Sequence, residues 1–523
     1  MRIGLITSGA FLQDSLAAEL GRIPACFVPL GNRRLLQRQH EEISKLADKV
    51  YISLPEDFEL YYEDRQQITD LGLTIIPCDA ALSIGDAIAN CINTISIYDA
   101  EIVVLYGDTV ITNLNAFMSD AVSVHLPLSE YRWADLNDLF GDRARDHADK
   151  TLSGLFAFAS IPDLLRSIIQ AKGDFLEAIR HYDELNELTL APDGEWFDFG
   201  HVQTYFRSTS LVTTQREFNE LQITAREVVK RSKNTHKIES EEAWFRDIPP
   251  SMRAFTPAYL GPRNSGGLSG YATANTYLST LSNLAVYGEL QSSTWVTIFN
   301  ACADFLNECR AVRPDTHLGI NPADYFGTKT RNRLEGFAAS DQGGILKNAR
   351  KMENRVLPSV DEMLEVTEQV IAEIDHGPEC LIHGDFCFSN IFFDFRSLSV
   401  KVIDPRGELP DGTRSIYGLQ SYDVAKLLHS VIGGYDLIIA GFVRARLEND
   451  TIAMEVPIRD NAHRRRIIEA FRNSVIATTY SPRAVDAMLV HLFLSMLPLH
   501  ADRPDRQIAM LGTAYQSFFA LEG

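Results

Sequence analysis

Short apolar runs alternate with helical patterns over the first 110 residues, and this alternation limits the folds open to that part of the chain. The strand-like runs are "RIGLIT", "KVYISL", "LTIIPC" and "EIVVLYG", and the helix-like runs are "RLLQRQHEEISKLA" and "IGDAIANCINTI". Strands that alternate with helices favour βαβ units on a mostly parallel sheet. The pattern continues through "TLSGLFAFAS" and "IPDLLRSIIQA" to about residue 207, which predicts an α/β domain.

A different pattern begins near residues 208–215, where we place the boundary between two domains, 1–210 and 211–523. A chain of 523 residues is too long for one ordinary core. Two short antiparallel strands in "EFNELQITAREVVKRS", a helix in "IESEEAWFRDI" and a Gly- and Ser-rich loop in "GPRNSGGLSGYAT" predict a small α+β lobe over about 211–275. Helical patterns dominate most of 276–523, which predicts a larger helical lobe.

The formal net charge of −21 argues against sequence-independent binding to nucleic acid or anionic membranes. It does not exclude anionic small molecules, because a local group of Lys and Arg can lie on an acidic protein. The seven cysteines form no CxxC pair, which favours reduced thiols in the cytoplasm over disulfides or a zinc site. No run approaches 18 apolar residues, so we expect no membrane span. The first apolar run is short and lacks a cleavage pattern, so we expect a buried strand rather than a signal peptide.

The stretch "LIHGDFCFSNIFFD", residues 381–394, places polar residues where an apolar strand begins, although strands normally avoid Asp and Asn. Phosphoryl transfer needs a carboxylate that orients the substrate hydroxyl and accepts its proton, and oxygen ligands that hold Mg²⁺ against the nucleotide phosphates. Asp385 suits the first task and Asn390 the second, and Asp404 in "VKVIDPRG" supplies a further metal-binding carboxylate. We expect "NIFFD" and "SVKVID" to form a hairpin that brings Asn390 and Asp404 to the same end.

Together, "HGDFCFSN", "IDPRG" and "SYDVAKLLHS" resemble the aminoglycoside phosphotransferase/choline kinase family, whose pattern is H-G-D-x-x-x-x-N, a strand and then I-D. Asp423 occupies the family's usual Asp at a helix start. The resemblance implies a protein-kinase-like fold of two lobes for residues 211–523, with ATP as phosphoryl donor, Mg²⁺, and Asp385 as catalytic base. We expect His383 to brace the loop, and Arg406 to meet either an anionic substrate or a buried carboxylate.

The same resemblance implies a strand Lys for the nucleotide phosphates and a helix Glu that pairs with it. Lys230 in "EVVKRS" and Glu241 in "IESEEAWF" fit these roles, with Glu242 and Glu239 as rivals for the second. The family's Gly-rich phosphate loop is missing, because "TTQREFNELQI" contains no glycine, and Asn219 is our candidate nucleotide contact there.

Four stretches of the first half resemble the sugar nucleotidyltransferases. They are "IPACFVPLGNRRLLQRQ", "LSIGDAIANCI", "VLYGDTVI" and "EWFDFGHVQTYFRS", in the family's order, and they cover about residues 1–207. The resemblance implies a Rossmann-like (GT-A-like) fold and a second NTP, of unknown base, as nucleotidyl donor. It also implies that Asp108 and Asp198 bind Mg²⁺, which clamps the α-phosphate, and that Asp108 is catalytic.

The first half also departs from that family in its cations. The opening G-x-G-x-R loop is here "SGAFLQDS", which keeps only Gly9 as a phosphate contact, and Ala25 stands where the family has a Lys. The reaction normally uses these cations to offset charge as the sugar phosphate attacks. Arg22, Arg33 or Arg34 could take their place. The sequence therefore leaves two roles for this domain, nucleotidyl transfer or binding without catalysis.

The two resemblances predict a bifunctional enzyme, because the product of one domain belongs to the substrate class of the other. The kinase would phosphorylate a hydroxyl of a sugar or amino alcohol, and the transferase would join that phosphate to a nucleotide for a cell-surface polysaccharide such as a capsule. The alternatives are a kinase with a non-catalytic N-terminal domain and an antibiotic phosphotransferase. Choline would call for an aromatic cage, but we expect Trp244, Tyr271 and Trp295 in the core. The sequence leaves open the substrate and whether the chain forms a homo-oligomer.

Overall fold

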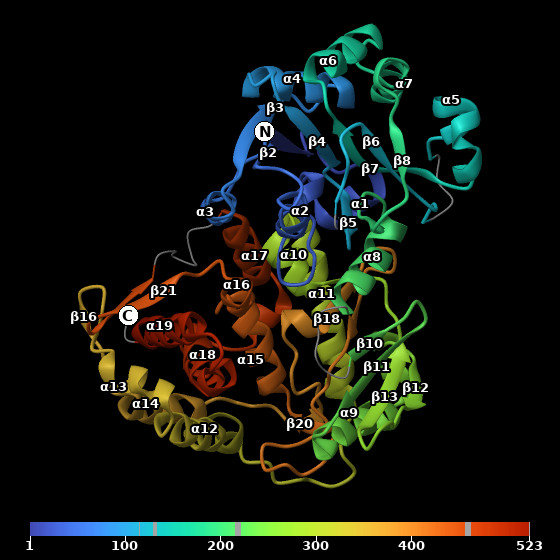
Figure 1. The fold of residues 1–523 in the computed structure, drawn as a ribbon. Coiled ribbons are helices and arrows are strands. Elements are labelled where there is room, and N and C mark those ends of the chain that lie inside the picture. Colours follow the sequence, from blue (N-terminus) through green and yellow to red (C-terminus); the bar gives the residue numbers. More distant parts are fainter. Residues whose placement is uncertain (115, 129–132, 215–220, 455–461, 522–523) are drawn as a thin grey trace. The chain divides into compact units, whose positions relative to one another are not determined.

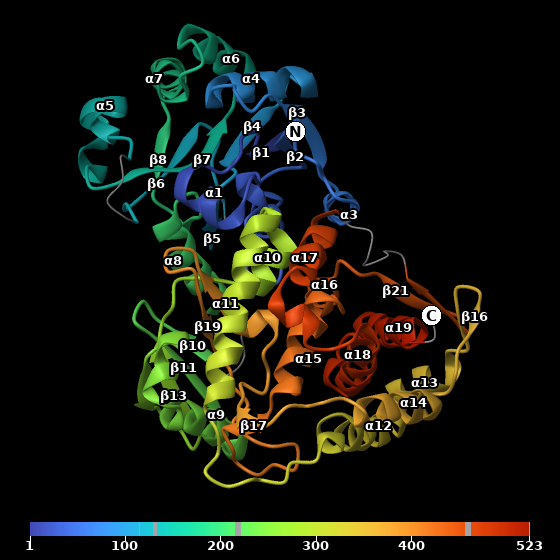
Figure 2. The same cartoon turned by 180° about the vertical axis from the view of Figure 1, so that it is seen from behind.

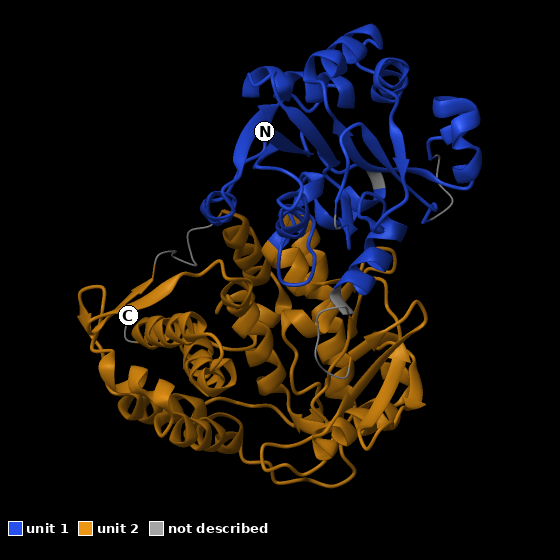
Figure 3. Ribbon diagram, in the orientation of Figure 1, with its two compact units in different colours: residues 1–215, 287–289 blue, residues 216–286, 290–523 orange. Residues whose placement is uncertain are grey.

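The computed structural model describes residues 1–114, 116–128, 133–214, 221–454 and 462–521. The described chain divides into two compact units (Figure 3). Unit 1 contains residues 1–215 and 287–289, and unit 2 contains residues 216–286 and 290–523.

A seven-stranded, mostly parallel sheet forms the centre of unit 1, which confirms the predicted α/β class (Figure 1). Its strands are β1 (Arg2–Thr7), β2 (Lys49–Pro55), β3 (Thr74–Cys78), β4 (Glu101–Tyr106), β6 (Ala121–His125), β7 (Thr151–Phe158) and β8 (Thr189–Ala191). They lie in the order β3-β2-β1-β4-β7-β6-β8, and β7 runs antiparallel to both of its neighbours. The first apolar run of the chain is thus a buried strand, as expected, because β1 pairs with β2 and β4 on its two sides.

The helices of unit 1 are α1 (Asp14–Leu20), α2 (Leu35–Ile43), α3 (Tyr62–Asp70), α4 (Ile84–Ile95), α5 (Leu136–Phe140), α6 (Ile161–Gln170), α7 (Phe175–Asn186) and α8 (Val202–Thr214). α4, α6 and α7 pack against one another in both views (Figure 1, Figure 2). Ser83, Ser160 and Asp174 cap their N-termini by accepting hydrogen bonds from backbone N–H groups of the first turn. Their buried apolar residues join those of the sheet in one core.

A second, two-stranded sheet positions the carboxylates of unit 1. β5 (Thr109–Thr112) and β9 (Glu195–Asp198) pair antiparallel, with Thr109 opposite Asp198. The backbone N–H of Phe199 donates a hydrogen bond to the carbonyl of Asp108 at 2.8 Å. The pairing therefore brings Asp108 and Asp198 together, although 90 positions separate them in the sequence.

Unit 2 begins with an antiparallel sheet of four strands in the order β10-β11-β13-β12 (Figure 1). These strands are β10 (Leu221–Ile223), β11 (Glu227–Ser232), β12 (Tyr259–Pro262) and β13 (Ser269–Ala274), and the predicted helix is α9 (Thr235–Asp247). The prediction of a loop over residues 261–273 is wrong. β12 and β13 pair there, and only residues 263–268 separate the two strands. The glycine that suggested a loop instead permits close strands: a Cβ on Gly270 would lie 2.6 Å from the Lys230 carbonyl oxygen.

Helices form most of the remainder of unit 2, as predicted. They are α10 (Leu281–Tyr287), α11 (Ser292–Ala311), α12 (Lys329–Ala338), α13 (Ile345–Asn348), α14 (Val360–Ala372), α15 (Gln420–Val431), α16 (Tyr435–Ala440), α17 (Ala462–Arg472), α18 (Pro482–Met496) and α19 (Pro504–Leu521). α12, α14, α15 and α19 all pack against α18, whose side chains are mostly buried. An antiparallel sheet followed by a helical part is the α+β arrangement that we predicted for this half of the chain.

Several short strands lie among these helices. The predicted hairpin is present as β18 (Ile391–Asp394) and β19 (Ser399–Val402), which pair antiparallel, and β14 (Ser279–Thr280) extends it. β17 (Glu379–Leu381) pairs with β20 (Tyr417–Leu419). A further sheet, β16-β15-β22-β21, was not predicted; its strands are β15 (Lys351–Met352), β16 (Arg355–Val356), β21 (Ala445–Glu448) and β22 (Thr451–Met454). Strands of two to four residues carry too little periodicity to be seen in the sequence.

One helical segment in the described part of the chain, Pro482–His500, is long and apolar enough to cross a membrane by length and composition alone. Within the protein, 61% of it is buried. The core helix of a globular unit meets the same two criteria, so the segment is a weak indication of a membrane span.

Candidate active sites

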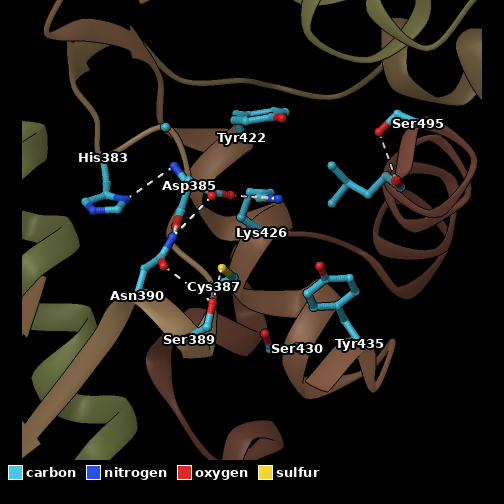
Figure 4. A network of polar contacts seen from close by, with 12 residues as sticks. His383, Asp385, Cys387, Ser389, Asn390, Tyr422, Lys426, Ser430, Tyr435 and Ser495 are labelled. Atoms are coloured by element: carbon cyan, nitrogen blue, oxygen red, sulfur yellow. Dashed lines mark hydrogen bonds and ion pairs between the residues drawn. The ribbon is translucent and has the colours of Figure 1, made fainter. Parts of the chain in front are cut away.

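The loop between β17 and β18 holds Asp385 and Asn390 against each other (Figure 4). The Asn390 side-chain amide donates to the Asp385 backbone carbonyl at 2.9 Å and to its carboxylate Oδ2 at 3.1 Å. The other carboxylate oxygen, Oδ1, lies 2.7 Å from the ammonium of Lys426 on α15. Both oxygens of Asp385 are therefore held in place, while 38% of its side chain remains exposed.

Buried residues brace this loop from beneath. His383 is buried; its Nε2 lies 2.9 Å from the Ile403 carbonyl, and its Nδ1 accepts from the Asp385 backbone N–H at 3.3 Å. The Asp423 carboxylate accepts from the backbone N–H groups of His383 and Gly384, both at 2.7 Å. Burial lowers the pKa of His383 to about 4, so the ring is neutral at neutral pH. These contacts give His383 the bracing position that we expected.

Lys426 is a residue of this site that we did not predict. Its ammonium, on a side chain only 9% exposed, pairs with Asp385. Burial alone would raise the pKa of Asp385, but the charge and hydrogen bond of Lys426 outweigh it and hold that pKa far below the ordinary value. The stretch "DVAKLLHSV" carried a signal, because a Lys in a helix whose residues are otherwise apolar or buried needs a partner.

Lys230 on β11 lies between two carboxylates at the other end of the site. Its ammonium lies 2.7 Å from Glu241 Oε2 on α9 and 3.1 Å from Asp404 Oδ1. The Tyr271 hydroxyl donates to the same Glu241 oxygen at 3.2 Å. Burial acts to lower the pKa of Lys230, but the charges of Asp404 and Glu241 outweigh it and raise the pKa above its usual range.

The pairing resolves which Glu of α9 faces Lys230. Glu242 instead accepts a hydrogen bond from Tyr259, and Glu239 forms an ion pair with Arg414. Of the three candidates, Glu241 is therefore the one in contact with Lys230.

The loop that carries Asp404 presses against α9. Asp404 has φ +56° and Gly407 has φ +65°, so both adopt left-handed backbone, which Gly and Asp tolerate better than most residues. A Cβ added to Gly407 would overlap the Ser240 carbonyl. The position of Asp404 is thus coupled to the helix that carries Glu241.

The donors at this site suit Mg²⁺ that is shared with nucleotide phosphates. The Ile403 backbone N–H donates to the Asn390 carbonyl at 3.0 Å, so the hairpin brings Asn390 and Asp404 to the same end. Mg²⁺ prefers carboxylate and amide oxygens and usually takes one or two from the protein, with phosphate and water completing the shell. Across the described residues no group of three or more His, Cys, Asp or Glu could hold a metal by itself. Asn390 and Asp404 are thus two oxygen donors at one end of the hairpin that could hold Mg²⁺ together with phosphate oxygens.

Other predicted residues of unit 2 take different positions. Asn219 lies outside the described residues. Trp244, Tyr271 and Trp295 are buried in the core, as expected, and form no open cage. The Trp244 indole donates to the Ile382 carbonyl at 2.7 Å, and Trp295 stacks on Phe388 at 5.9 Å between centroids.

In unit 1, Asp108 and Asp198 lie side by side. A Cβ on Gly200 would overlap the Asp108 carboxylate, so a glycine is needed where the chain passes it. Asp198 is buried, accepts a hydrogen bond from the Thr204 hydroxyl and lies 3.1 Å from His201 Nδ1. Burial, followed by the charge of Asp198, raises the pKa of Asp108 to about 6. A buried carboxylate and a partly buried one that repel each other fit a divalent cation, which would remove that repulsion.

The cations that could replace the missing Lys of unit 1 are already paired. Arg22 lies 2.6 Å from Asp57, Arg33 lies 2.6 Å from Glu41, and Arg34 lies 2.6 Å from Asp64. The Arg34–Asp64 pair is buried, with side chains 7% and 2% exposed.

Gly9 follows β1 and packs against Cys78 of β3. A Cβ added to Gly9 would lie 2.8 Å from Cys78 Sγ. All seven cysteines are free and buried.

Comparison with known proteins gives fold similarity alone. No protein-family model matches the chain, and no curated protein matches it. A UDP-glucose pyrophosphorylase from Acinetobacter baumannii is 10% identical over 42% of this chain and 95% of that chain, with a TM-score of 0.31. A glucosamine kinase in complex with glucosamine, ADP and inorganic phosphate is 15% identical over 60% of this chain and 82% of that chain, with a TM-score of 0.37. An aminoglycoside-3′-phosphotransferase of type VIII is 12% identical over 60% of this chain and all of that chain, with a TM-score of 0.27. The N-terminal part is thus similar to a nucleotidyltransferase structure and the C-terminal part to kinase and phosphotransferase structures.

Proposed function

We propose that unit 2 is a small-molecule kinase that transfers the γ-phosphoryl group of ATP to a hydroxyl. The observation that carries this proposal is that Lys230 contacts both Glu241 and Asp404, at the site whose loop orients Asp385 and Asn390. Phosphoryl transfer requires positioned charges more than covalent chemistry, and this set supplies them.

Each residue has a role that its contacts support. Asp385 orients the acceptor hydroxyl and takes its proton, and Lys426 keeps that carboxylate ionised and fixed. Lys230, held by Glu241, binds the nucleotide phosphates. Asn390 and Asp404 hold Mg²⁺, which when bound neutralises charge on the phosphates. Asn219 remains a proposed nucleotide contact.

We further propose that unit 1 is a nucleotidyltransferase that uses the product of the kinase. Asp108 and Asp198 would hold Mg²⁺, Asp108 would be the catalytic residue, and Gly9 would lie at the nucleotide phosphates. The product would be a nucleotide-activated sugar or amino alcohol, made in the cytoplasm for a cell-surface polysaccharide. Support comes from the adjacent carboxylates and from the free thiols, which suit a reducing compartment.

A second candidate keeps the kinase and makes unit 1 a non-catalytic binding module. Ala25 in place of the family's Lys favours it, as does the pairing of Arg22, Arg33 and Arg34 with carboxylates. Under this reading Ala25→Lys creates no activity. An antibiotic phosphotransferase is a weaker alternative, which predicts that expression of the gene raises resistance to aminoglycosides.

Pyrophosphate release separates these readings. The protein is mixed with Mg²⁺, each of the four NTPs in turn, and a panel of sugar 1-phosphates with phosphocholine and glycerol phosphate. Release with one pair identifies the base and the substrate together and supports the bifunctional enzyme. Its absence, with ADP still formed from ATP and a hydroxyl acceptor, supports the kinase with a binding module. If neither product forms, the proposed function is wrong.

A further inference from the structure

Two helices and a loop of unit 2 bring basic side chains together beside Asp385. Tyr422 and Lys426 lie one turn apart on α15, and Lys329 and Arg333 lie one turn apart on α12, so each pair occupies one face of its helix. The Lys329 ammonium donates to the Tyr422 hydroxyl at 2.5 Å and lies 4.8 Å from the centre of its ring. The two helix faces therefore meet at Tyr422, while Lys426 reaches Asp385 (Figure 4).

Arg406 completes the group from the loop after β19. A Cβ on Gly384 would lie 2.6 Å from Arg406 Cβ, so this residue lies directly over the loop that carries Asp385. The charge of Arg406 acts on Asp385 and on Tyr422, and so does that of Arg333. We call Lys329, Arg333, Arg406 and Lys426 the basic cluster.

Carboxylates near the basic cluster do not balance it. Asp385 pairs with Lys426 at 2.7 Å, and Glu408 lies 3.8 Å from Arg406. Asp423 accepts two backbone hydrogen bonds beneath the loop. Among the described residues, three carboxylates therefore lie close to the four cations.

The two α12 cations carry most of this excess. In the part of the chain that the structure describes, neither Lys329 nor Arg333 forms an ion pair with a carboxylate; Arg333 donates to the Ser495 carbonyl at 3.0 Å.

Tyr422 and Lys329 respond to the positive charges that surround them. Burial raises the pKa of Tyr422, but the charges of Lys329, Arg406 and Lys426 outweigh it and lower that pKa to about 7. Burial, followed by the charges of Arg406 and Arg333, lowers the pKa of Lys329 to about 8. An anion bound among these groups would relieve both effects.

The position of α12 indicates which substrate brings that anion. α12 packs against α18 and the short helices around residues 324–328, 341–344 and 497–500, all in the helical lobe. The nucleotide side of the site, in contrast, is built from β11, α9 and Asp404, where Lys230 already supplies a cation. An anion held by Lys329 and Arg333 therefore belongs to the acceptor rather than to ATP.

We propose that the kinase acceptor is a hydroxyl compound that also carries a carboxylate or phosphate group, which Lys329, Arg333 and Arg406 bind. This inference rests on the proposed kinase function and narrows its substrate class away from amino alcohols and aminoglycosides. The acceptor oxygen forms a bond to the γ-phosphorus as the bond to the β–γ bridging oxygen breaks. ADP leaves with that electron pair, and the hydroxyl proton passes to Asp385.

The test measures ADP formation from Mg-ATP with matched acceptors. The phosphate arm compares glycerol 3-phosphate with glycerol and ribose 5-phosphate with ribose; the carboxylate arm compares gluconate with glucose. Glucosamine and kanamycin are the cationic acceptors. We expect turnover with an anionic member of a pair to exceed that with its neutral partner at least tenfold. Equal or better turnover of neutral or cationic acceptors overturns the inference and leaves the kinase standing. If no acceptor gives ADP, the proposed kinase fails and the inference with it.

Two variants show whether α12 supplies the cations. Lys329→Gln and Arg333→Gln each remove one charge-assisted hydrogen bond, so kcat/KM for the anionic acceptor should fall about 10- to 100-fold while the KM for ATP stays unchanged. The matched control is Lys347→Gln, an exposed cation on α13 outside the basic cluster, which should change neither constant. A rise in the KM for ATP instead would assign the cluster to the nucleotide and overturn the inference.

Phosphate binding gives a reading that does not depend on turnover. Calorimetric titration with inorganic phosphate is carried out with Mg²⁺ and ADP saturating the nucleotide site. Lys329→Gln and Arg333→Gln should each weaken phosphate binding at least tenfold, and Lys347→Gln should not. Equal binding by all four proteins would overturn the inference.

Discussion

Asp385→Asn removes the charge that the proposed mechanism needs and leaves Lys426 without its counterion. The two side chains lie 2.7 Å apart, with 38% of Asp385 but only 9% of Lys426 exposed. We therefore expect two separable effects, a loss of kinase turnover and a loss of stability. An amide can neither take the hydroxyl proton nor attract the ammonium as a carboxylate does.

The magnitudes follow from the environment of the pair. A positioned general base contributes about 10²- to 10⁴-fold, so turnover should fall at least 100-fold. Removal of one partner of a fully buried ion pair costs about 3–5 kcal/mol. Because water reaches Asp385, screening reduces this value, and we expect a loss of about 1–3 kcal/mol in the free energy of unfolding.

A second substitution separates the two effects. In Asp385→Asn/Lys426→Met the buried charge is gone and Met fills a similar volume, so stability should recover while turnover stays lost. Urea denaturation of unit 2 is followed by tryptophan fluorescence in a Trp133→Phe/Trp196→Phe background, which removes the signal of unit 1, and ADP formation reports turnover. Turnover above a tenth of wild type in Asp385→Asn would show that Asp385 is not the base. A double variant no more stable than the single one would refute the reasoning about the ion pair.

Three further perturbations test other parts of the chain. Asp64→Ala leaves the buried Arg34 guanidinium unpaired and should destabilise unit 1 by about 3–5 kcal/mol in urea denaturation; a cost below 1 kcal/mol would show that the pair is not important. Gly407→Ala forces a Cβ against the Ser240 carbonyl and should displace α9, raising the KM for ATP about tenfold or more without abolishing folding; unchanged kinetics would disprove the coupling. Because the pKa of Asp108 is raised to about 6 in the folded protein, folding favours the protonated carboxyl. The free energy of unfolding of unit 1 therefore decreases as the pH rises toward and through about 6. Mg²⁺ should offset that decrease, so it should raise the melting temperature of unit 1 more at pH 7.5 than at pH 5, and Asp108→Asn should abolish the difference.

Local sequence patterns were sufficient for much of the fold. Period-two and period-3.6 repeats predicted β1 to β4, β7, α2, α4 and α6 of the first half, because those elements are long enough for one face to be buried regularly. The antiparallel pairs at 221–232 and 391–402 were also visible, since each joins neighbours in the sequence. The β12–β13 hairpin was missed because Gly and Ser, which usually mark loops, there allow strands to approach closely.

Tertiary structure alone decided the charge around Asp385. The sequence by itself determined the order of the motif residues, from Asp385 to Asn390 and Asp404, because short loops and a hairpin connect them. It could not choose Glu241 over Glu239 and Glu242, since the twist of α9 against β11 makes that choice. Nor could it place Lys426 or the α12 cations, which lie about 40 to 55 positions from Asp385 in the sequence. Electrostatic interaction depends on distance in space and on burial, and both are set only when helices that are remote in sequence pack together.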